Sequence, residues 1–221
     1  MDFLTQNFSD LVVKLGEHFI IALLALALGV LVAMPIGIFI TKNEKLSSIV
    51  MTIASILQTI PSLALLSIMV PLVGVGKKPA IIALFIYSLL PILRNTTIGI
   101  NKVDESLVDA AKGMGMTPNE IIQKVQLPLA APVIMSGIRL SAIYVISWTA
   151  IASYIGAGGL GDFIFSGLNT FDTKLILLGT VPVTLLALVA DLILGKVEEK
   201  VKPKETSQVK TAPSSDLKEE I

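Results

Sequence analysis

The chain has 221 residues, of which 53% are hydrophobic and 15% charged, and a mean hydropathy of +0.82, so too little polar surface exists to coat a soluble globule. It has no cysteine and a single histidine, which excludes disulfide frameworks, thiolate sites and His-based metal clusters or triads. The net charge of zero argues against nucleic acid as a partner, and no metal or cofactor is expected.

Five apolar stretches reach the length of about 20 residues that a helix needs to cross a bilayer. They predict an all-α polytopic membrane protein with spans at residues 19–40, 49–73, 79–100, 133–155 and 174–194. Residues 1–17 are expected to form an external N-terminal segment, and residues 18–200 the transmembrane domain. Residues 201–221 are predicted to be a disordered cytoplasmic tail, because few of them are apolar. Glycines within the spans are expected to let helices approach closely, namely Gly29, Gly37, Gly137 and Gly179.

Lysine and arginine residues gather on one side of these spans. If the N-terminus lies outside, most of them fall in the inner segments, including Lys42, Lys102, Lys112 and Lys196. Cytoplasmic loops of membrane proteins carry such an excess of positive charge. The sequence therefore predicts an external N-terminus and a cytoplasmic C-terminus.

A polar insert at about residues 101–128, between the third and fourth spans, is predicted to be a helical hairpin. Asp104 can cap a first helix, whose apolar residues are expected on one side, namely Leu107, Val108, Ala111 and Met114. Gly115 lies where a helix end needs a positive φ. The segment Thr117-Pro118-Asn119-Glu120 is a capping box that starts a second helix, which is expected to end before Pro128.

The spacing of this insert matches a motif of transport proteins. The residues Asp109-Ala110-Ala111, Gly115 and Val125-Gln126-Leu127-Pro128 resemble the EAA loop of ABC importer permeases, with Asp in place of Glu and Val in place of Ile. The resemblance implies that the loop sits in a cleft of an ATPase subunit and passes ATP-driven motion to the spans. The implied coupling residues are Asp109, Ala110, Ala111, Gly115, Thr117, Pro118, Glu120, Val125, Leu127 and Pro128.

Ala110 and Ala111 are expected to leave a shallow surface into which the partner fits. Without the resemblance, the insert could equally be an amphipathic hairpin that lies on the lipid interface or packs back on the bundle.

Three further segments narrow the resemblance, namely Gln58–Ser62, Ala83–Thr96 and Ile155–Gly161. Together with the loop they resemble the permeases of osmoprotectant importers for glycine betaine, carnitine and choline, over about residues 15–200. The resemblance implies a type I ABC importer transmembrane domain in the bacterial cell membrane that performs no chemistry. The implied partners are two copies of an ABC ATPase, a second permease subunit (identical or homologous), an extracellular solute-binding protein and the lipid bilayer. A permease for methionine or another small solute stays an alternative, as does an ion-coupled carrier or membrane scaffold.

Neutral polar and aromatic side chains within the spans are candidates for lining a solute path, namely Gln58, Thr59, Ser62, Tyr87, Tyr144 and Trp148. Tyr144 and Trp148 lie four residues apart and share a helix face. Aromatic faces attract quaternary ammonium groups through cation–π interactions. Helix–helix hydrogen bonding, packing and interfacial anchoring are the alternative roles of these residues.

Four glycines after the fourth span are candidates for an outer gate, for a docking edge of the binding protein or for a simple tight turn, namely Gly156, Gly158, Gly159 and Gly161. Asp162 and Asp172 are candidate contacts at its rim. Arg139 and Asp191 are ionisable residues within apolar stretches, and we expect them to pair or to extend to the interface. His18 is expected at the membrane interface.

Overall fold

The computed structural model describes residues 2–203, with side chains from residue 6 onward, and this range contains helices and no strand. The all-α prediction is therefore confirmed within this range, whereas the predicted tail at residues 201–221 lies outside the described residues from residue 204 onward. Four long helices form the body, namely α1 (Asp2–Ile40), α4 (Lys77–Asn101), α7 (Leu127–Ala152) and α9 (Thr173–Val201). The shorter elements are α2 (Glu44–Thr59), α3 (Ser62–Val73), α5 (Glu105–Gly113), α6 (Pro118–Ile121), the π-turn η1 (Ile122–Gln126), the 3₁₀ turn η2 (Ser153–Ile155) and α8 (Gly161–Thr170).

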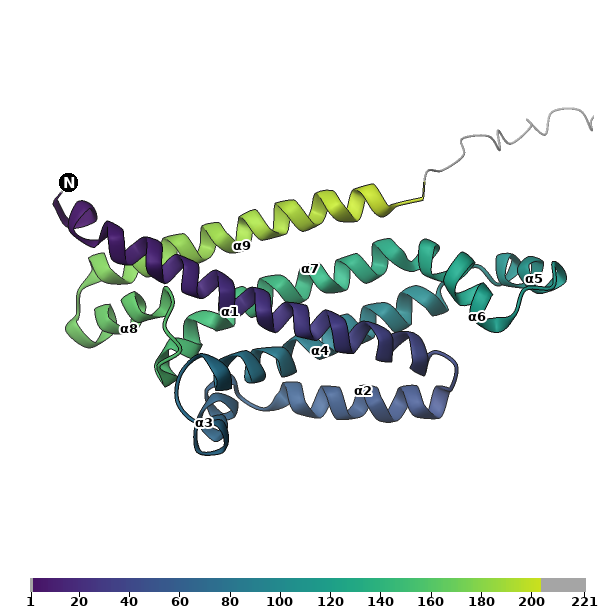
Figure 1. The fold of residues 1–221 in the computed structure, drawn as a ribbon, viewed down its shortest axis with the longest axis horizontal. Coiled ribbons are helices and arrows are strands. Elements are labelled where there is room, and N and C mark those ends of the chain that lie inside the picture. The colour runs from purple at the N-terminus through teal and green to yellow at the C-terminus, as the bar shows by residue number, and fades with distance from the viewer. Residues whose placement is uncertain (1, 204–221) are drawn as a thin grey trace, which may run out of the picture.

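The helices give the molecule two distinct ends (Figure 1). Helices α5 and α6 project at one end, which we call the hairpin end. The segment 155–161, α8 and the start of α1 lie at the other, which we call the glycine end. Because α1, α4 and α9 run toward the hairpin end and α7 runs back, the N-terminus and the end of α9 lie at opposite ends of the molecule (Figure 1).

The second predicted span is broken. Within residues 2–203, four helices are long and apolar enough to cross a membrane, and a fifth span results only if α2 and α3, bent by 94°, are counted together. Pro61 lacks an N–H and disfavours helical backbone at the residue before it, so Ile60 is extended (φ −63°, ψ 127°) and α2 ends at Thr59. The predicted span over residues 49–73 is therefore a bent pair of helices, with the bend at Pro61. Helix α1 also continues without a break through the predicted boundary at residue 17.

Small residues let α1 and α4 pack closely. Ala25, Gly29, Ala33 and Gly37 recur at every fourth position of α1 and are all buried. A Cβ atom on Gly29 would lie only 2.9 Å from the Cβ of Ser88. Close van der Waals packing holds helices together in a bilayer, where burial of apolar surface gives little advantage over lipid. The predicted role of the span glycines is thus confirmed for this pair of helices.

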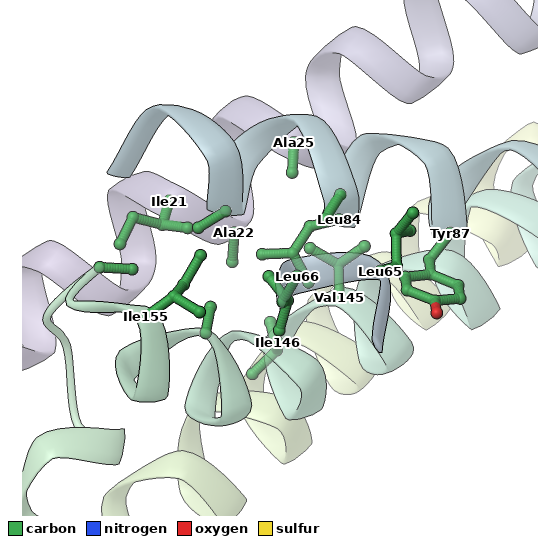
Figure 2. Packing of buried hydrophobic residues seen from close by; sticks show 14 residues of the cluster. Ile21, Ala22, Ala25, Leu65, Leu66, Leu84, Tyr87, Val145, Ile146 and Ile155 are labelled. Carbon is green, nitrogen blue, oxygen red and sulfur yellow. The ribbon is translucent and has the colours of Figure 1, made fainter. Parts of the chain in front are cut away.

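The largest buried cluster lies toward the glycine end and joins α1, α3, α4 and α7 (Figure 2). Ile21 and Ala22 of α1 meet Leu84 of α4 and Val145 of α7 there. His18 is also completely buried at this end, and its Nε2 atom lies 2.9 Å from the Ile146 carbonyl oxygen. The prediction of an interfacial His18 is therefore wrong, because the turn of α1 that carries it packs inward against α7.

Candidate functional site

The first helix of the hairpin is capped as the sequence predicts. The Asp104 carboxylate accepts the N–H of Ser106 at 2.9 Å at the start of α5. Hydrogen bonding from Ser106 lowers the pKa of Asp104, so the cap is ionised at neutral pH. After α5 ends at Gly113, the chain reverses through Gly115 at φ +78°. The predicted cap and the predicted positive φ are both confirmed.

The second helix restarts on the predicted capping box. The N–H of Thr117 donates to Glu120 Oε2 at 3.0 Å, and the N–H of Glu120 donates to Thr117 Oγ1 at 3.4 Å. Pro118 occupies the first turn of α6, where its missing N–H is tolerated. The Lys124 ammonium pairs with the same Glu120 carboxylate at 2.9 Å. Local hydrogen bonds therefore fix the turn between the two hairpin helices.

The prediction that this second helix ends before Pro128 is wrong. Helix α6 continues through η1 into α7, with the N–H of Leu127 bonding to the carbonyl of Ile122. The wider π-turn inserts one extra residue, and Pro128 then falls in the first turn of α7, where no N–H is needed. Residues 118–155 form one candidate span of 38 residues, about 57 Å at 1.5 Å per residue. The hairpin is thus joined to α7 by continuous helical backbone.

The apolar side chains of α5 divide between two faces instead of sharing the expected one. Ala111 is 1% exposed and Val108 is half-buried, so both face the body of the protein. Leu107 is 47% exposed and Met114 is 70% exposed. With the exposed Ala110 between them, they follow helical spacing along one side. We call Leu107, Ala110 and Met114 the outer face of α5; the expectation that Ala111 shares this surface is wrong.

The other predicted coupling residues lie around this face. Asp109 is exposed and pairs with Lys112 at 2.8 Å, and this carboxylate raises the pKa of Lys112. Thr117, Pro118 and Glu120 make the turn, Val125 lies in η1, and Leu127 and Pro128 begin α7. The predicted coupling residues therefore include exposed residues on α5 and the residues that hold the hairpin in its conformation.

The hairpin is fastened to the first span as well as to α7. The Lys42 ammonium, in the turn between α1 and α2, donates to Asn119 Oδ1 at 2.8 Å. A cavity of about 320 Å³ lies beside this contact, between the hairpin and the helix ends, with Ile100, Val108 and Ile121 in its wall. No sequence pattern indicates this contact of Lys42, because the two residues are 77 positions apart.

Three of the candidate path residues form one aromatic cluster. The rings of Tyr87 and Trp148 meet edge to face at 4.5 Å between centroids, and Tyr144 stacks on Trp148 at 5.4 Å. Tyr87 is 3% exposed, whereas Tyr144 is 37% exposed on the outside of the described chain. The predicted shared face of Tyr144 and Trp148 is confirmed, and we call the three residues the aromatic cluster.

The polar candidates flank the break between α2 and α3. Gln58 and Thr59 end α2, and Ser62 starts α3. Thr59 Oγ1 donates within its own helix to the Ile56 carbonyl at 2.7 Å. The Tyr87 hydroxyl donates to the carbonyl of Ile60, which joins the break to the aromatic cluster. All six candidate path residues therefore lie close to one kink in the chain.

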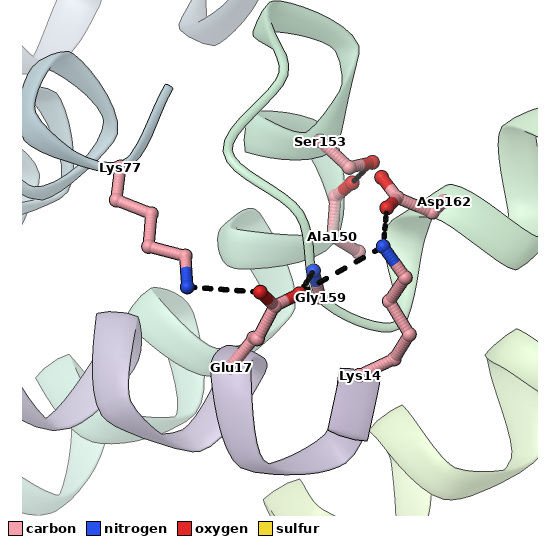
Figure 3. Close-up of polar contacts among 7 residues, drawn as sticks. All are labelled: Lys14, Glu17, Lys77, Ala150, Ser153, Gly159 and Asp162. Carbon is pink, nitrogen blue, oxygen red and sulfur yellow. Dashed lines mark hydrogen bonds and ion pairs between the residues drawn. The ribbon is translucent and has the colours of Figure 1, made fainter. Parts of the chain in front are cut away.

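The glycine end is held by charged residues that the sequence analysis did not single out (Figure 3). Glu17 accepts the Lys77 ammonium at 2.9 Å and the N–H of Gly159 at 3.1 Å. Lys14 pairs with Asp162, one of the predicted rim residues. The other, Asp172, caps α9 by accepting the N–H of Lys174 at 2.8 Å. The sequence contains one indication of this charged network, because Lys14 and Glu17 lie one helical turn apart at the edge of the first span.

The four gate candidates do not share one conformation. Gly156, Gly158 and Gly159 have φ between +74° and +86°, as a tight turn requires. Gly161 starts α8, and a Cβ atom there would lie 2.8 Å from the carbonyl carbon of Ala150. The segment is thus a packed turn.

Arg139 and Asp191 form a two-pronged ion pair between α7 and α9. Arg139 Nε lies 2.5 Å from Asp191 Oδ1, and Nη2 lies 2.8 Å from Oδ2. Glu198 Oε2 adds a third contact at 3.3 Å from Nη1. Such parallel hydrogen bonds fix the relative position of two helices. The expected pairing is confirmed, with Glu198 as an additional partner.

Solved transporter structures share this fold. The chain is similar to the methionine ABC transporter MetNI in inward-facing conformations, with a TM-score of 0.80 and 24% identity over 87% of this chain and 96% of that chain. It is also similar to an amino acid ABC transporter solved with histidines, with a TM-score of 0.75 and 20% identity over 90% of this chain and 99% of that chain. At these identities the likeness shows the fold alone, which is that of the transmembrane domain of a type I ABC importer.

Residues 25–203 match the family of binding-protein-dependent transport system inner membrane components, and the chain belongs to this family. It is 54% identical to the carnitine transport permease protein OpuCB of Listeria monocytogenes, over 91% of this chain and 93% of that protein. It is 53% identical to the choline transport system permease protein OpuBB of Bacillus subtilis, over 92% of this chain and 94% of that protein. The chain is therefore a multi-pass transport component of a bacterial cell membrane, and the alternative of an ion-coupled carrier or scaffold is not supported.

Proposed function

We propose that this chain is the permease subunit of an ABC importer that brings osmoprotective quaternary amines, such as glycine betaine, carnitine and choline, into the cell. Its relatives at 52–54% identity are permeases named for these solutes. The structural neighbours that are named for methionine and histidine share only 20–24% identity. Sequence similarity thus favours the quaternary amines.

The observation that carries the coupling role is the exposed outer face of α5, which the Gly115 turn joins to the continuous helix of α6, η1 and α7. An apolar, solvent-exposed patch on a charged hairpin is typical of a surface that a protein partner covers. The partner is an ATPase that hydrolyses ATP, while this chain performs no catalysis. Closure of two ATPase subunits would push two such hairpins, and the helix over residues 118–155 would tilt as a rigid body.

The hairpin end is cytoplasmic in this proposal. The turn between α1 and α2, the start of α2, the end of α4, α5 and the last turns of α9 lie toward it (Figure 1). These segments, with the residue directly after α4, contain Lys42, Lys45, Lys102, Lys112 and Lys196, which agrees with the excess of basic residues on the inner side of membrane proteins. The N-terminus and the segment 155–161 are then external, where a solute-binding protein docks. The aromatic cluster lines half of a solute path, and a second permease, identical or homologous, supplies the other half.

Uptake measurements test the solute class. The chain is expressed with its neighbouring ATPase and binding-protein genes in cells that lack other importers, and radiolabelled choline, carnitine, glycine betaine and methionine are offered separately. We expect ATP-dependent uptake of at least one quaternary amine and none of methionine. Uptake of methionine alone would overturn the solute assignment while leaving the transporter class intact.

A charge on the outer face of α5 tests the docking surface. Ala110→Glu places a carboxylate on the exposed surface, so we expect the ATPase to be lost on purification in mild detergent. Ala110→Ser is the matched control and should keep the ATPase bound. Ala111→Glu is unsuitable, because this residue is buried and the hairpin itself would be disrupted. Full binding and uptake by Ala110→Glu would count against docking at this face.

A further inference from the structure

We propose that helix α3 is a hinged gate of the solute path and that the Tyr87 hydroxyl is the latch that holds it. The inference rests on the proposed function as a permease, since a gate needs a solute path. Tyr87 then acts as a positioning residue: it works through the Ile60 carbonyl, to which its hydroxyl donates a hydrogen bond.

Helix α3 has a hinge at each of its two ends. At one end the extended residues Ile60 and Pro61 turn the chain by 94°. At the other, Gly74 and Gly76 adopt φ of +100° and +110°, a region that other residues rarely enter. Hinge motions are absorbed by a few residues of this kind at the ends of an element. Helix α3 can therefore rotate as a unit without unfolding.

Helix α3 packs on the bundle along one side only. Leu65 and Leu66 are buried in the largest cluster, and Met69 and Val70 pack partly buried against it, whereas Leu72 is 70% exposed. At a length of about 18 Å it is too short to span a bilayer by itself. Besides the Tyr87 bond at its first hinge, the N–H of Gly76 donates to the Ile155 carbonyl at 3.1 Å at its second hinge. Both bonds are single contacts that a small rotation would break.

The latch is in contact with the surface that a solute would reach. The ring of Tyr87 lies beside Leu65 at the edge of the buried cluster (Figure 2), and its edge-to-face partner is Trp148. Trp148 in turn stacks on the exposed Tyr144. A quaternary ammonium group bound to this stack by cation–π attraction would shift Trp148 and, through it, Tyr87. Solute occupancy would thus weaken the hydrogen bond at the first hinge of α3.

A simpler role for Tyr87 must be separated from this one. Pro61 frees carbonyl groups of α2 from helical bonding, and a hydroxyl that satisfies one of them stabilises the kink. Such a purely structural hydroxyl would change stability when removed, but it would leave the response to solute unaltered. The test therefore measures motion of α3 with and without solute.

A spin label on α3 reports the motion of this helix directly. The chain has no native cysteine, so an introduced cysteine is its single labelling site. The label is placed at Leu72→Cys on α3, with Leu168→Cys on α8 as the reference position, because both side chains are exposed. The complex with its ATPase is reconstituted in nanodiscs, and spectra are recorded with and without saturating choline or glycine betaine. Tyr87→Phe keeps the ring and its contact with Trp148 but removes the hydroxyl.

We expect Tyr87→Phe to increase the mobile fraction of the Leu72 label about twofold to tenfold, the factor that one lost hydrogen bond gives. The Leu168 label should not change. Choline or glycine betaine should move the wild-type Leu72 spectrum toward that of Tyr87→Phe, and should have little effect in the variant. Tyr154→Phe, which removes an exposed hydroxyl at the same end, is the matched control and should behave as wild type.

Unchanged Leu72 spectra in Tyr87→Phe would overturn the latch, and a wild-type spectrum that ignores the solute would overturn its coupling to the aromatic cluster. If Tyr87→Phe does not assemble, Pro61→Ala decides instead, because it favours continuous helix at the hinge and should immobilise the Leu72 label. An equally mobile label in Pro61→Ala would exclude a hinge there. If the wild-type complex transports no quaternary amine, the proposed function is disproved. The spectra recorded without solute would still test whether the Tyr87 hydrogen bond restrains α3.

Discussion

At the scale of single residues, one missing side chain sets the distance between α4 and α7. A Cβ atom on Gly137 would lie 2.5 Å from the Cβ of Asn95 and 2.9 Å from the Pro91 carbonyl oxygen. Neither atom can retreat easily, because one is attached directly to the backbone and the other belongs to it. Gly137 is therefore needed for space, whereas Gly16 on α1 has no atom within 4 Å of its virtual Cβ.

Gly137→Ala should lower the free energy of unfolding by about 1–3 kcal/mol, the usual cost of overpacking. Gly16→Ala is the matched control and should be neutral or stabilise by up to about 1 kcal/mol, since alanine favours helix. Thermal unfolding in detergent compares the two variants with the wild type. Equal melting temperatures for all three would contradict the close packing of α4 on α7.

The ion pair between Arg139 and Asp191 makes a second prediction at this scale. Arg139→Leu leaves two carboxylates, Asp191 and Glu198, without their partner in an apolar bundle, so the melting temperature should fall by several degrees. Asp191→Leu made in the same chain should restore part of the loss, because one unpaired charge is removed. If the double variant is less stable than Arg139→Leu alone, the two residues do not stabilise the protein through their ion pair.

At the scale of elements, the continuity of α6, η1 and α7 decides how motion passes into the membrane. A capping box fixes where α6 begins, and the π-turn carries the helix past Pro128. A hairpin joined to α7 through a flexible loop could bind an ATPase without transmitting force. In this protein the hairpin that carries the outer face of α5 is joined to α7 by unbroken helix from α6 onward.

Two glycines in the π-turn should separate ATPase binding from force transmission. Val125→Gly with Gln126→Gly adds a cost of about 1 kcal/mol per glycine and loosens the connection without touching the outer face of α5. We expect the ATPase to co-purify normally while uptake per ATP hydrolysed drops severalfold. Glu199→Gly with Lys200→Gly, in the exposed last turns of α9, is the control and should transport normally. Undiminished coupling in the π-turn variant would show that α7 is not the lever.

At the scale of the whole molecule, the described chain presents an apolar exterior along α9. Leu177, Val181, Leu185, Leu188 and Leu192 follow one side of this helix and are 50–63% exposed. Lipid covers such a surface in a monomer, and a second subunit can cover part of it in a complex. The exposed Tyr144 at the aromatic cluster likewise lies at the outside of a single chain, where one copy cannot enclose a solute.

The intact importer should therefore contain two permease subunits and two ATPase subunits. Native mass spectrometry of the complex, in which this chain contributes 23.5 kDa per copy, measures the ratio directly. If the second permease is a homologue, its mass will differ and identify it. A complex with one permease that still takes up solute would refute the shared path.

The sequence alone determined the helical class, the hairpin and its caps, since apolar runs and capping residues act locally. The same local logic placed Tyr144 on Trp148 and put Gly115 at a positive φ. Prediction failed at the end of the hairpin, where one local rule met another. Pro61 bends the second span, but Pro128 does not stop α6, because a π-turn moves it into a position that tolerates proline.

Only the tertiary structure decided which faces are free and which distant groups meet. The sequence could not separate buried Ala111 from exposed Ala110, because both suit either environment. It could not pair Glu17 with Lys77, Lys42 with Asn119 or Tyr87 with Ile60, since contacts between segments far apart in sequence depend on how the helices pack. Local sequence thus determines where the helices form, whereas close packing of small residues between helices determines which helices lie side by side.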